Sequence, residues 1–470
     1  MRKTKIICTI GPSCSDENTI REMMLAGMNV ARLNFSHGTH EDHLEKIKII
    51  KRLREELDLP VAIMLDTKGP EYRIRKFRND KVNLNPGDSF TFTTEDIIGD
   101  EHRVSVSYKG LADDLEIGDT ILLNNGLLSF EVTEISGGEI RTVVCDGGEL
   151  SNNKSMAFPG KVLKQVFLSE QDKSDILFGI ENDVDFIACS FVSAKQDILD
   201  IYNFVRENGG GDIDLIAKIE NQAGIDNIEE IVEYCAGIMI GRGDMGVEIA
   251  FEKLPAIQKN LITKCRLLGK RVITATEMLE SMIHNPRPTR AETSDVANAI
   301  YDGTSAIMLS GETAAGAYPV LALKTMAKIA EETERGIDYA SLFRNSDFRI
   351  HNTVDAISHA TCGMAIDVGA KAMAVCSLSG ATVRMVSRFR CPVDILGLTT
   401  SEKTRRKLAL SWGVTPKICE KFDSTDVLFY AAKLNARSTF NLKSGDTIVT
   451  TGGMTNGTSG NTNLIKIDRI

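Results

Sequence analysis

The sequence lacks the cysteine pairs, long apolar runs and basic excess that mark zinc proteins, membrane proteins and nucleic-acid-binding proteins. Its ten cysteines form no C-x-x-C pair, so we expect no zinc site. Their mostly apolar surroundings predict buried free thiols in a reducing compartment. No window approaches the roughly 18 uncharged apolar residues of a membrane span. The apolar stretch of MRKTKIICTIGPS is only a strand long, which does not predict a secretory signal.

Length and charge narrow the class further. A chain of 470 residues exceeds one typical core and predicts two to four domains. The net charge of −10 argues against a nucleic-acid surface, which needs a basic field. Anionic substrates stay possible, because a few Arg and Lys residues in a cleft can override the global sign locally. We therefore expect a cytoplasmic protein that binds neither nucleic acid nor membrane.

Apolar strand-like segments alternate with helical patterns on both sides of residues 70–160. Three precede that region and five follow it, in two pieces of about 245 residues, close to the ~250 of a (β/α)8 TIM barrel. The alternative on this pattern is a doubly wound open sheet. The last helix of this part is expected from Pro319 to about Arg335. The expected strands lie at residues 4–10, 28–35, 61–67, 184–190, 213–220, 236–243, 271–276 and 305–310.

Two further units accompany the predicted barrel. Residues 70–160 carry short alternating segments between turn signals such as PGD and ISGG, which predicts a small inserted β-barrel domain. From residue 346 onward, a helix and the strands AMAVC, VDILGLT and DTIVTTG predict a separate α/β domain. The expected organisation is a catalytic barrel of residues 1–69 and 161–345, the insert of residues 70–160, and a C-terminal domain of residues 346–470.

Polar residues follow most of the expected barrel strands. Because active sites of such barrels lie at the carboxyl ends of the strands, these residues form a candidate site. They are Arg32, Asn34, Ser36, His37, Asp66, Thr67, Lys68, Lys218, Glu220, Arg242, Asp244, Thr274, Thr276, Glu277, Ser310 and Glu312.

Lys218 and Glu220 are the most informative pair. Two residues apart on a strand, they share one face, either as a functional pair at the barrel mouth or as a structural ion pair. Glu220 and Asp244 end adjacent strands, and two carboxylates beside a lysine suit a divalent cation that bridges to a phosphate. Mg²⁺ fits better than zinc, because no His or Cys accompanies them.

A glycine pattern at residues 241–246 matches G-x-G-x-x-G, the dinucleotide-binding turn. Asp244 would direct a carboxylate at a pyrophosphate, and Arg266 stands near the position where an acidic residue is expected. We therefore interpret the glycines as bringing backbone amides near an anionic group at a helix start, with Asp244 on the metal.

A series of motifs, in order, resembles those of the pyruvate kinase family. They cover residues 3–73 and 216–319 and are KTKIICTIGPS, MNVARLNFSHG, LDTKGPEYR, AKIENQ, GRGDMGVE, ITATEMLESM, NPRPTRAE, DVANAI and DGTSAIMLSGETAAGAYP. The resemblance implies an eight-stranded barrel, a mobile lid domain inserted after the third strand, a C-terminal regulatory domain and a homotetramer. It also implies glycolytic phosphoryl transfer from phosphoenolpyruvate to ADP, giving pyruvate and ATP, with Mg²⁺ and K⁺.

The resemblance further implies a role for each matching residue. Glu220 and Asp244 match the Mg²⁺ ligands, and the K⁺ site matches Asn34, Ser36, Asp66 and Thr67, with Glu71 where K⁺-dependent members carry glutamate. The catalytic positions are Lys218, Arg73 and Thr276, the last where the enolate is protonated through a water. Phosphoenolpyruvate binding involves Arg32, Lys218, Gly243, Asp244 and Thr276. The nucleotide side comprises Pro12, Arg32, Asn34, His37, Arg73 and Lys154.

The chain departs from the family pattern at several positions, none of them assigned to a metal or phosphoryl contact. They are Tyr72, Asn124, Asn125, Ala157, Phe158, Ala223 and Glu277. In the C-terminal domain, CSLSGATVRM resembles the family's sugar-phosphate effector loop. Its hydroxyls and amides at a helix start suit a phosphate, although a capped turn explains the pattern too. The predicted effector residues are Ser377, Ser379, Gly380 and Thr382.

Two other functions fit parts of the pattern. A barrel lyase that acts on a pyruvate enolate through Mg²⁺ would use the carboxylate pair but not the nucleotide and K⁺ positions. A non-catalytic relative could bind phosphosugars through the C-terminal domain. The departures from the family pattern in the insert favour this second function, whereas the intact Lys218, Glu220, Asp244 and Thr276 argue against it.

Overall fold

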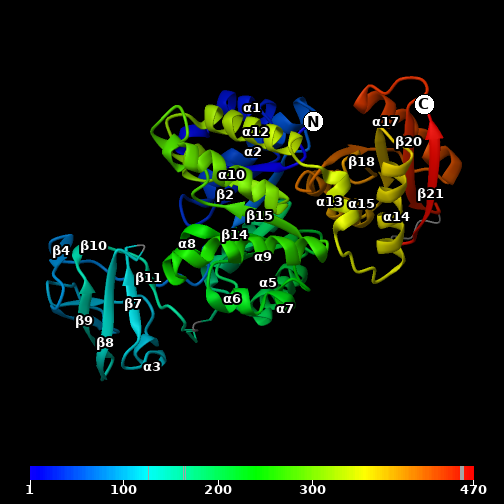
Figure 1. Cartoon of the computed structure of the whole chain (residues 1–470). Helices are drawn as coiled ribbons and strands as arrows, with labels where there is room; N and C mark the ends of the chain where they lie inside the picture. The colour runs from blue at the N-terminus through cyan, green and yellow to red at the C-terminus, as the bar shows by residue number, and fades with distance from the viewer. Residues whose placement is uncertain (125, 162, 165, 456–459) are drawn as a thin grey trace.

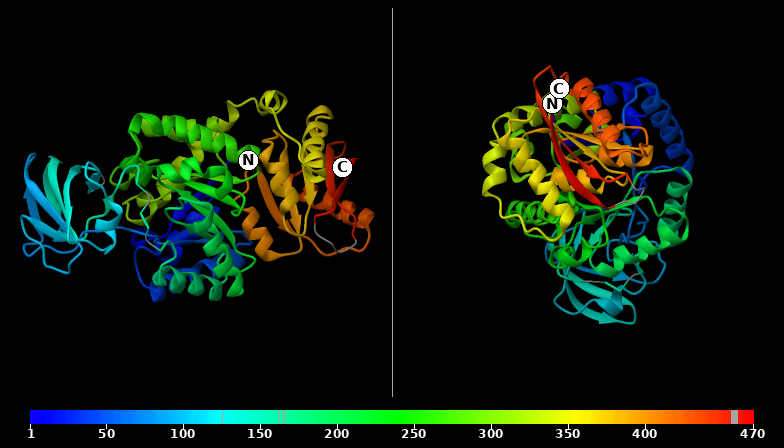
Figure 2. Two further views of the ribbon diagram at one scale, coloured as in Figure 1. Left: turned by 90° about the horizontal axis from the view of Figure 1, so that it is seen from below. Right: turned by 90° about the vertical axis from the view of Figure 1, so that its right-hand side faces the viewer.

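The chain forms three units in a row, with a closed barrel in the middle (Figures 1 and 2). The computed structural model describes residues 1–124, 126–161, 163–164, 166–455 and 460–470. The inserted domain and the C-terminal domain lie on opposite sides of the barrel. This architecture confirms the predicted fold class and excludes the doubly wound open sheet.

Eight parallel strands close the barrel in the order β1-β16-β15-β14-β13-β12-β3-β2. Every one of them falls inside a segment predicted as a strand. Their bounds are β1 Lys5–Thr9, β2 Val30–Asn34, β3 Ala62–Asp66, β12 Phe186–Cys189, β13 Asp214–Ile219, β14 Gly237–Gly241, β15 Arg271–Ala275 and β16 Ala306–Leu309.

Helices surround the barrel, and the expected helix of residues 319–335 is α12, Pro319–Arg335. The others are α1 Glu17–Leu25, α2 His40–Glu56, α4 Glu170–Glu181, α5 Lys195–Glu207, α6 Gln222–Asp226, α7 Ile228–Ile231, α8 Arg242–Glu248, α9 Leu254–Leu267, α10 Arg290–Asp302, α11 Gly311–Ala314 and α13 Tyr339–Asn345. Short 3-10 turns are η1 Pro12–Cys14, η2 Phe251–Lys253 and η3 Glu280–Ile283.

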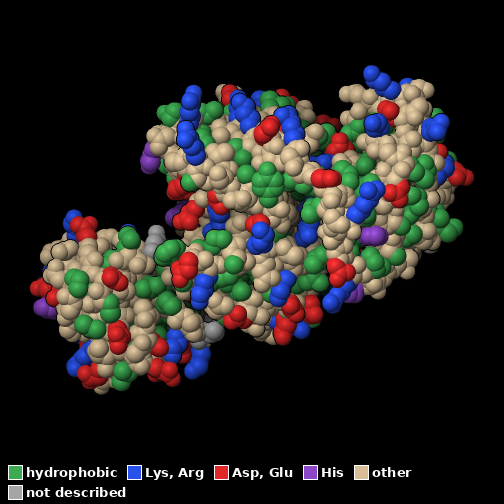
Figure 3. Space-filling view, in the orientation of Figure 1, with side chains coloured by type: hydrophobic (Ala, Val, Ile, Leu, Met, Phe, Trp, Pro, Cys, Tyr) green, Lys and Arg blue, Asp and Glu red, His purple; other side chains and the backbone are tan. Residues whose placement is uncertain are grey.

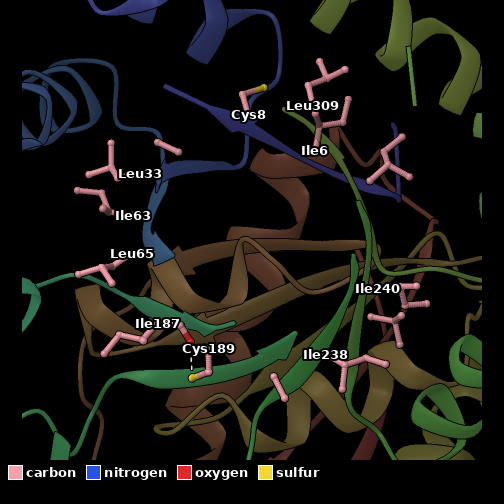
Figure 4. Close-up of a cluster of buried hydrophobic side chains, with 14 of the residues drawn as sticks. Ile6, Cys8, Leu33, Ile63, Leu65, Ile187, Cys189, Ile238, Ile240 and Leu309 are labelled. Atoms are coloured by element: carbon pink, nitrogen blue, oxygen red, sulfur yellow. Dashed lines mark hydrogen bonds between the residues drawn. The ribbon is translucent and has the colours of Figure 1, made fainter. Parts of the chain in front are cut away.

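The alternation of side chains along each strand produces two apolar layers. Side chains such as Ile63, Leu65, Ile238 and Ile240 point outward and pack under the helices (Figure 4). The alternate side chains, Ile216 among them, fill the barrel interior. The barrel is therefore a packed core rather than a pore, and a site can form only where its strands end.

The inserted domain is a curled six-stranded sheet, in the order β11-β7-β8-β9-β5-β6, with a two-stranded ribbon of β10 and β4. Its own core contains Phe90, Phe92 and Phe130. The strands are β4 Lys81–Leu84, β5 Ser89–Thr93, β6 Arg103–Ser105, β7 Thr120–Leu123, β8 Leu128–Ser136, β9 Glu139–Asp146, β10 Gly148–Ser151 and β11 Met156–Ala157, and the one helix described here is α3, Leu111–Asp114.

The C-terminal domain carries a five-stranded sheet in the order β19-β18-β17-β20-β21. Its strands are β17 Ala372–Cys376, β18 Asp394–Thr399, β19 Val414–Ile418, β20 Thr447–Gly453 and β21 Thr462–Arg469, and its helices are α14 Thr353–Asp367, α15 Ala381–Arg388, α16 Glu402–Leu408 and α17 Thr425–Phe440. The sequence did not predict β19, because Pro416 interrupts it; a proline is tolerated there since β19 is an edge strand.

Helix α16 and the segment after it close the amino ends of the barrel strands. Leu410 packs into the barrel interior, and Arg406 Nε donates to Asp185 Oδ1, just before β12, at 2.7 Å. Lys5 Nζ, at the start of β1, donates to the carbonyl of Val414 at 2.7 Å. The C-terminal domain thus covers one end of the barrel, which places the candidate site at the other.

Three general expectations can be compared with the structure. All ten cysteines are free, and eight of them are buried. Within the described residues, no helix has the length and apolarity needed to cross a bilayer. Figure 3 shows acidic and basic side chains interspersed over the face in view.

Candidate active site

A buried cluster of charged side chains lies at the carboxyl ends of the barrel strands. Lys218 Nζ is 3.0 Å from Glu220 Oε1 and 3.2 Å from Asp66 Oδ1. Arg32 Nε donates to Asp66 Oδ2 at 2.6 Å. Ser190 Oγ accepts a hydrogen bond from Lys218 Nζ at 2.7 Å. One lysine and one arginine are thus held by two carboxylates in a small volume.

Strand alternation explains why these side chains meet. Ile216 fills the barrel interior, and Lys218 and then Glu220 follow it at intervals of two residues. Met64 likewise fills the interior, and Asp66 follows it on β3. Each of these polar side chains therefore faces inward like the apolar residues before it on its strand, and lies at the carboxyl end where the barrel is open.

Burial and charge determine the protonation of the cluster. Burial acts against the charge of Lys218, but Asp66 and Glu220 outweigh it and raise the pKa of the ammonium. Burial also opposes ionisation of Asp66, but Arg32 and Lys218 hold its pKa below the usual range. Burial raises the pKa of Glu220, and the charge of Asp244 adds to the rise, which Lys218 opposes. Lys218 is therefore a fixed positive charge, and a nearby cation favours the ionised form of Glu220.

Gly241 permits the close approach of β14 to Glu220. A Cβ at this position would lie 2.6 Å from Glu220 Oε1 and 2.7 Å from its Cγ, so any larger residue would displace the carboxylate. Directly after it, α8 begins, with Asp244 exposed in its first turn. Gly241 thus leaves room for Glu220, and Asp244 follows it in the same wall of the cleft.

The loop after β15 is held in an unusual backbone conformation. Thr276 and Glu277 have φ values of 64° and 54°, a region that residues other than glycine rarely adopt, β-branched threonine least of all. Arg242 Nη2 donates to the carbonyl oxygens of Thr276 at 2.6 Å and Glu277 at 3.0 Å, and Nη1 donates to Asp295 at 2.8 Å. Since the surroundings hold this strain, the position of Thr276 is set by the fold.

Thr276 and Gly243 meet across the rim. The backbone N–H of Gly243 donates to Thr276 Oγ1 at 2.8 Å, and Thr276 Oγ1 lies 2.6 Å from the carbonyl of Ala275. The two predicted substrate-binding groups are therefore adjacent.

A cleft of about 360 Å³ separates the inserted domain from this rim. Tyr72 and Phe158 line it from the insert, and Glu220 and Asp244 line it from the barrel. The rings of Tyr72 and Phe158 pack edge to face with centroids 5.5 Å apart. These two departures from the family pattern therefore contact each other in the insert; Asn125, a third, lies outside the described residues.

The remaining predicted site residues make contacts of their own. Arg73 is paired with Glu71, and its Nη1 donates to the carbonyl of Asn153 at 2.6 Å. The carbonyl of the next residue, Lys154, accepts from the N–H of Ile74 at 3.0 Å. Asn34 is the register partner of Asp66 on the neighbouring strand, and its Oδ1 accepts from the N–H of Ser36 at 3.2 Å. Thr67 Oγ1 accepts from the N–H of Ser190 at 3.2 Å. The carbonyl of His37 lies 2.9 Å from His43 Nε2, and Pro12 begins η1.

Comparison with known proteins finds relatives that match along the whole chain. The family model of the pyruvate kinase barrel domain matches residues 1–323, and that of the pyruvate kinase alpha/beta domain matches residues 355–468. The chain belongs to the pyruvate kinase family. A pyruvate kinase of Clostridium perfringens is 45% identical over the full length of both chains. One of Staphylococcus epidermidis is 46% identical, over 99% of this chain and 80% of its own.

A solved structure agrees with both sequence comparisons. The crystal structure of a pyruvate kinase from Cryptosporidium parvum superposes with a TM-score of 0.95 at 36% identity, covering 100% of this chain and 96% of the other. The predicted family, fold class and phosphotransferase activity are confirmed.

Not every polar residue on this pyruvate kinase rim faces a substrate. Thr274 is fully buried, with its hydroxyl 3.0 Å from Thr304 Oγ1. Glu312 is also fully buried, and it accepts hydrogen bonds from the backbone N–H groups of Leu279 at 2.9 Å and Ser310 at 2.7 Å. These two residues, like Arg242, shape the loops instead.

Sequence reasoning missed Ser190 and Phe191. Ser190 contacts Lys218, and Phe191, with φ of 58°, donates its N–H to Glu220 Oε2 at 2.9 Å. The alternation signal could have identified Ser190, because it follows the interior Ala188 by two residues. No sequence signal indicates the backbone conformation of Phe191.

Glu248, in the cleft wall, gives a testable dependence of stability on pH. Burial raises its pKa from 4.5 to about 7. The folded state therefore binds the carboxyl proton of Glu248 more tightly than the unfolded state does. The stability that this protonated carboxyl contributes is lost as pH rises from about 4.5 through about 7. We expect Glu248→Gln to raise the melting temperature relative to wild type at pH 8 and not at pH 4.5. Thermal melts at both values test this, and an equal difference at both would contradict it.

Proposed function

We propose that the protein is a pyruvate kinase that transfers the phosphoryl group of phosphoenolpyruvate to ADP, giving pyruvate and ATP. The observation that carries this proposal is the position of Lys218. Its ammonium is buried between Asp66 and Glu220 where the barrel strands end, next to a cleft that the inserted domain can cover.

The geometry suits phosphoryl transfer because that reaction needs positioning and charge rather than covalent chemistry. The transferring group is loosely bonded in the transition state and carries charge on its outer oxygens. Lys218 and Arg32 supply fixed positive charge from one side, and Arg73 would supply it from the insert. Because Lys218 is already held by two carboxylates and Ser190, little reorganisation is needed when the charge develops.

The donor set fits Mg²⁺ bound together with substrate. Among the described residues, no group of three or more His, Cys, Asp or Glu side chains is placed to hold a metal ion. Mg²⁺ commonly takes one or two carboxylates and completes its shell with water and substrate phosphate oxygens. Glu220 and Asp244 would hold it, and its chemistry would be to neutralise the phosphoryl oxygens.

The groups beyond Lys218 complete the reaction. The N–H groups at the start of α8, with Gly243, would bind the substrate carboxylate, as helix amino ends favour anions. Thr276 Oγ1, placed beside Gly243, would hold the water that protonates the enolate. The nucleotide would lie toward Pro12, Asn34, His37 and Lys154.

A coupled assay tests the proposal. Purified protein is mixed with phosphoenolpyruvate, ADP, Mg²⁺ and K⁺, and pyruvate is followed with lactate dehydrogenase and NADH. We expect pyruvate formation that requires ADP. Pyruvate formed equally without ADP would contradict phosphoryl transfer to ADP, and no pyruvate with or without phosphosugars would favour the lyase and the non-catalytic relative together.

K⁺ dependence is a second expected property. Asn34, Ser36, Asp66 and Thr67 would provide oxygen ligands, and Glu71, which has one buried oxygen without a hydrogen-bond partner among the described residues, would balance the charge. We expect activity to fall when Na⁺ replaces K⁺ at constant ionic strength. Equal rates in the two buffers would contradict this assignment.

The C-terminal loop is proposed as an effector site for a phosphosugar. Ser377, Ser379 and Thr382 line a cavity of about 110 Å³ at the start of α15, where Gly380 has φ of 73°. The hydroxyl of Thr382 lies 2.6 Å from that of Thr462. We expect Thr382→Glu to abolish activation by phosphosugars, measured as the change in half-saturating phosphoenolpyruvate. Unchanged activation would contradict the site.

The remaining family expectations are part of this proposal. The domains would divide at residues 70, 161 and 346, the protein would assemble as a homotetramer, and it would act in glycolysis in the cytoplasm.

A further inference from the structure

A recess at the joint between barrel and C-terminal domain is lined by basic side chains. It lies between α9, β15 and the end of α15. Six of its lining residues are Arg or Lys, and none is Asp or Glu; they are Arg266, Lys270, Arg271, Arg384, Arg388 and Arg390. Three come from the barrel and three from the C-terminal domain, so the recess gathers positive charge from two units.

Carboxylates neutralise only part of this charge. Arg271 Nη1 is 2.8 Å from Asp214, and Arg388 Nη2 is 3.4 Å from Asp355. Across the described parts of the chain, the four other cations have no ion pair. They are Arg266, Lys270, Arg384 and Arg390. The recess therefore carries an excess of positive charge in a place with little water to screen it.

Several guanidinium nitrogens in the recess lack a partner. The buried Nε atoms of Arg266, Arg388 and Arg390 have no hydrogen-bond partner within the described residues. Arg388 and Arg390 are only 4% and 3% exposed. Burial, followed by the charge of Arg266, lowers the pKa of Arg390 to about 9, so these cations destabilise one another. Buried cationic groups whose N–H donors lack acceptors are destabilising unless an anion or another acceptor binds them.

A structural role accounts for part of the cluster only. Arg388 Nη1 donates to the carbonyl of Leu267, at the end of α9, at 2.9 Å. Arg390 Nη2 donates to the carbonyl of Gly303, after α10, at 3.0 Å. These bonds hold the two domains together. They do not explain the side chain of Arg266, for which the described structure shows neither hydrogen bond nor ion pair, or the excess charge.

We infer that this recess is a binding site for a phosphate-class oxyanion, either inorganic phosphate or the phosphate group of a metabolite. Arginine forks match the oxygens of phosphate geometrically, and their bonds to it are charge-assisted. The enclosed volume of about 10 Å³ is close to the size of one water molecule. The anion would therefore sit at the mouth, with one oxygen directed inward. Arg388 and Arg390 lie toward the opposite end of α15 from Ser377 and Thr382, whereas Arg384 borders the proposed effector loop, because its Nη1 donates to the carbonyl of Ser379 at 3.2 Å.

The single tryptophan of the chain reports on this site. Trp412 lines the recess, and the Arg390 guanidinium lies 4.9 Å from its ring centroid. The tryptophan emission is titrated with inorganic phosphate, and in a parallel arm with glucose 6-phosphate, each against NaCl at equal ionic strength. We expect a saturable change beyond that caused by NaCl. Saturation by phosphate identifies the free ion as sufficient, and saturation by the sugar phosphate alone identifies an organic source.

Arg266→Met separates a binding role from a structural one. Because the guanidinium of Arg266 has no partner in the described structure, we expect its replacement to leave the melting temperature without ligand unchanged or raised. We expect it to weaken anion binding by about tenfold or more, the loss of one charge-assisted contact. Arg384→Met, at the other wall, should weaken binding similarly, whereas the exposed Arg335→Met should not. Emission that follows ionic strength alone, or anion binding by Arg266→Met as tight as wild type, would overturn the inference.

Discussion

Lys218→Met is expected to lower kcat by about 10²–10³-fold or more, that is by ~3–4 kcal/mol of barrier, the scale found for single electrostatic contacts to a transition state. The ammonium is buried and its pKa is raised, so it stays charged throughout the accessible pH range. Its interaction strengthens as charge develops on the phosphoryl oxygens. The effect should therefore fall on kcat rather than on the KM for phosphoenolpyruvate. Steady-state kinetics in the coupled assay measure both.

A control separates this loss from misfolding. Methionine leaves Asp66 bonded to Arg32, and Glu220 bonded to the N–H of Phe191, so the cluster keeps partners. Circular dichroism melts of the variant show whether the fold persists. Lys173→Met should keep wild-type kinetics, because this half-buried lysine on α4 lies outside the cluster and, among the described residues, pairs with Glu170 alone. A folded Lys218→Met enzyme with kcat within tenfold of wild type would contradict the assigned role.

Glu220→Gln is expected to raise the Mg²⁺ concentration for half-maximal activity by at least about tenfold. Changes in the outer shell of a metal site already cost 10–100-fold in affinity, and a direct ligand should cost at least as much. The amide keeps the size of the side chain and can still accept the hydrogen bond from Phe191. The loss is thus confined to charge and to one metal ligand. Activity as a function of Mg²⁺, and direct titration calorimetry, measure the change.

The matched control for this variant is Glu207→Gln, an exposed residue at the end of α5. It removes the same charge without touching the cleft, and we expect no change in the Mg²⁺ requirement. If Glu220→Gln showed the wild-type requirement, Asp244 alone would have to hold the metal, and the two-carboxylate assignment would be wrong.

Much of the fold and part of the site followed from periodicity. Strand and helix alternation predicted all eight barrel strands, because buried parallel strands are continuous apolar runs. The two-residue spacing of Lys218 and Glu220 predicted their shared face, and the structure places their charged atoms 3.0 Å apart. Local pattern was sufficient here because a barrel strand has only two faces.

Features that depend on tertiary contacts could not be predicted. The edge strand β19 was missed because Pro416 is unfavourable locally, and only its place in the sheet makes it acceptable. The role of Arg242 as a brace for Thr276 and Glu277 depends on the loop after a different strand. The contact between Tyr72 and Phe158 joins residues far apart in the sequence. None of these leaves a periodic signal.

The most direct test follows the phosphorus atom itself. The protein is mixed with phosphoenolpyruvate, ADP, Mg²⁺ and K⁺, and the reaction is recorded by ³¹P NMR without coupling enzymes. We predict that the phosphoenolpyruvate resonance is lost at the same rate as the three resonances of ATP appear. Loss of phosphoenolpyruvate with release of inorganic phosphate and no ATP would contradict phosphoryl transfer to ADP.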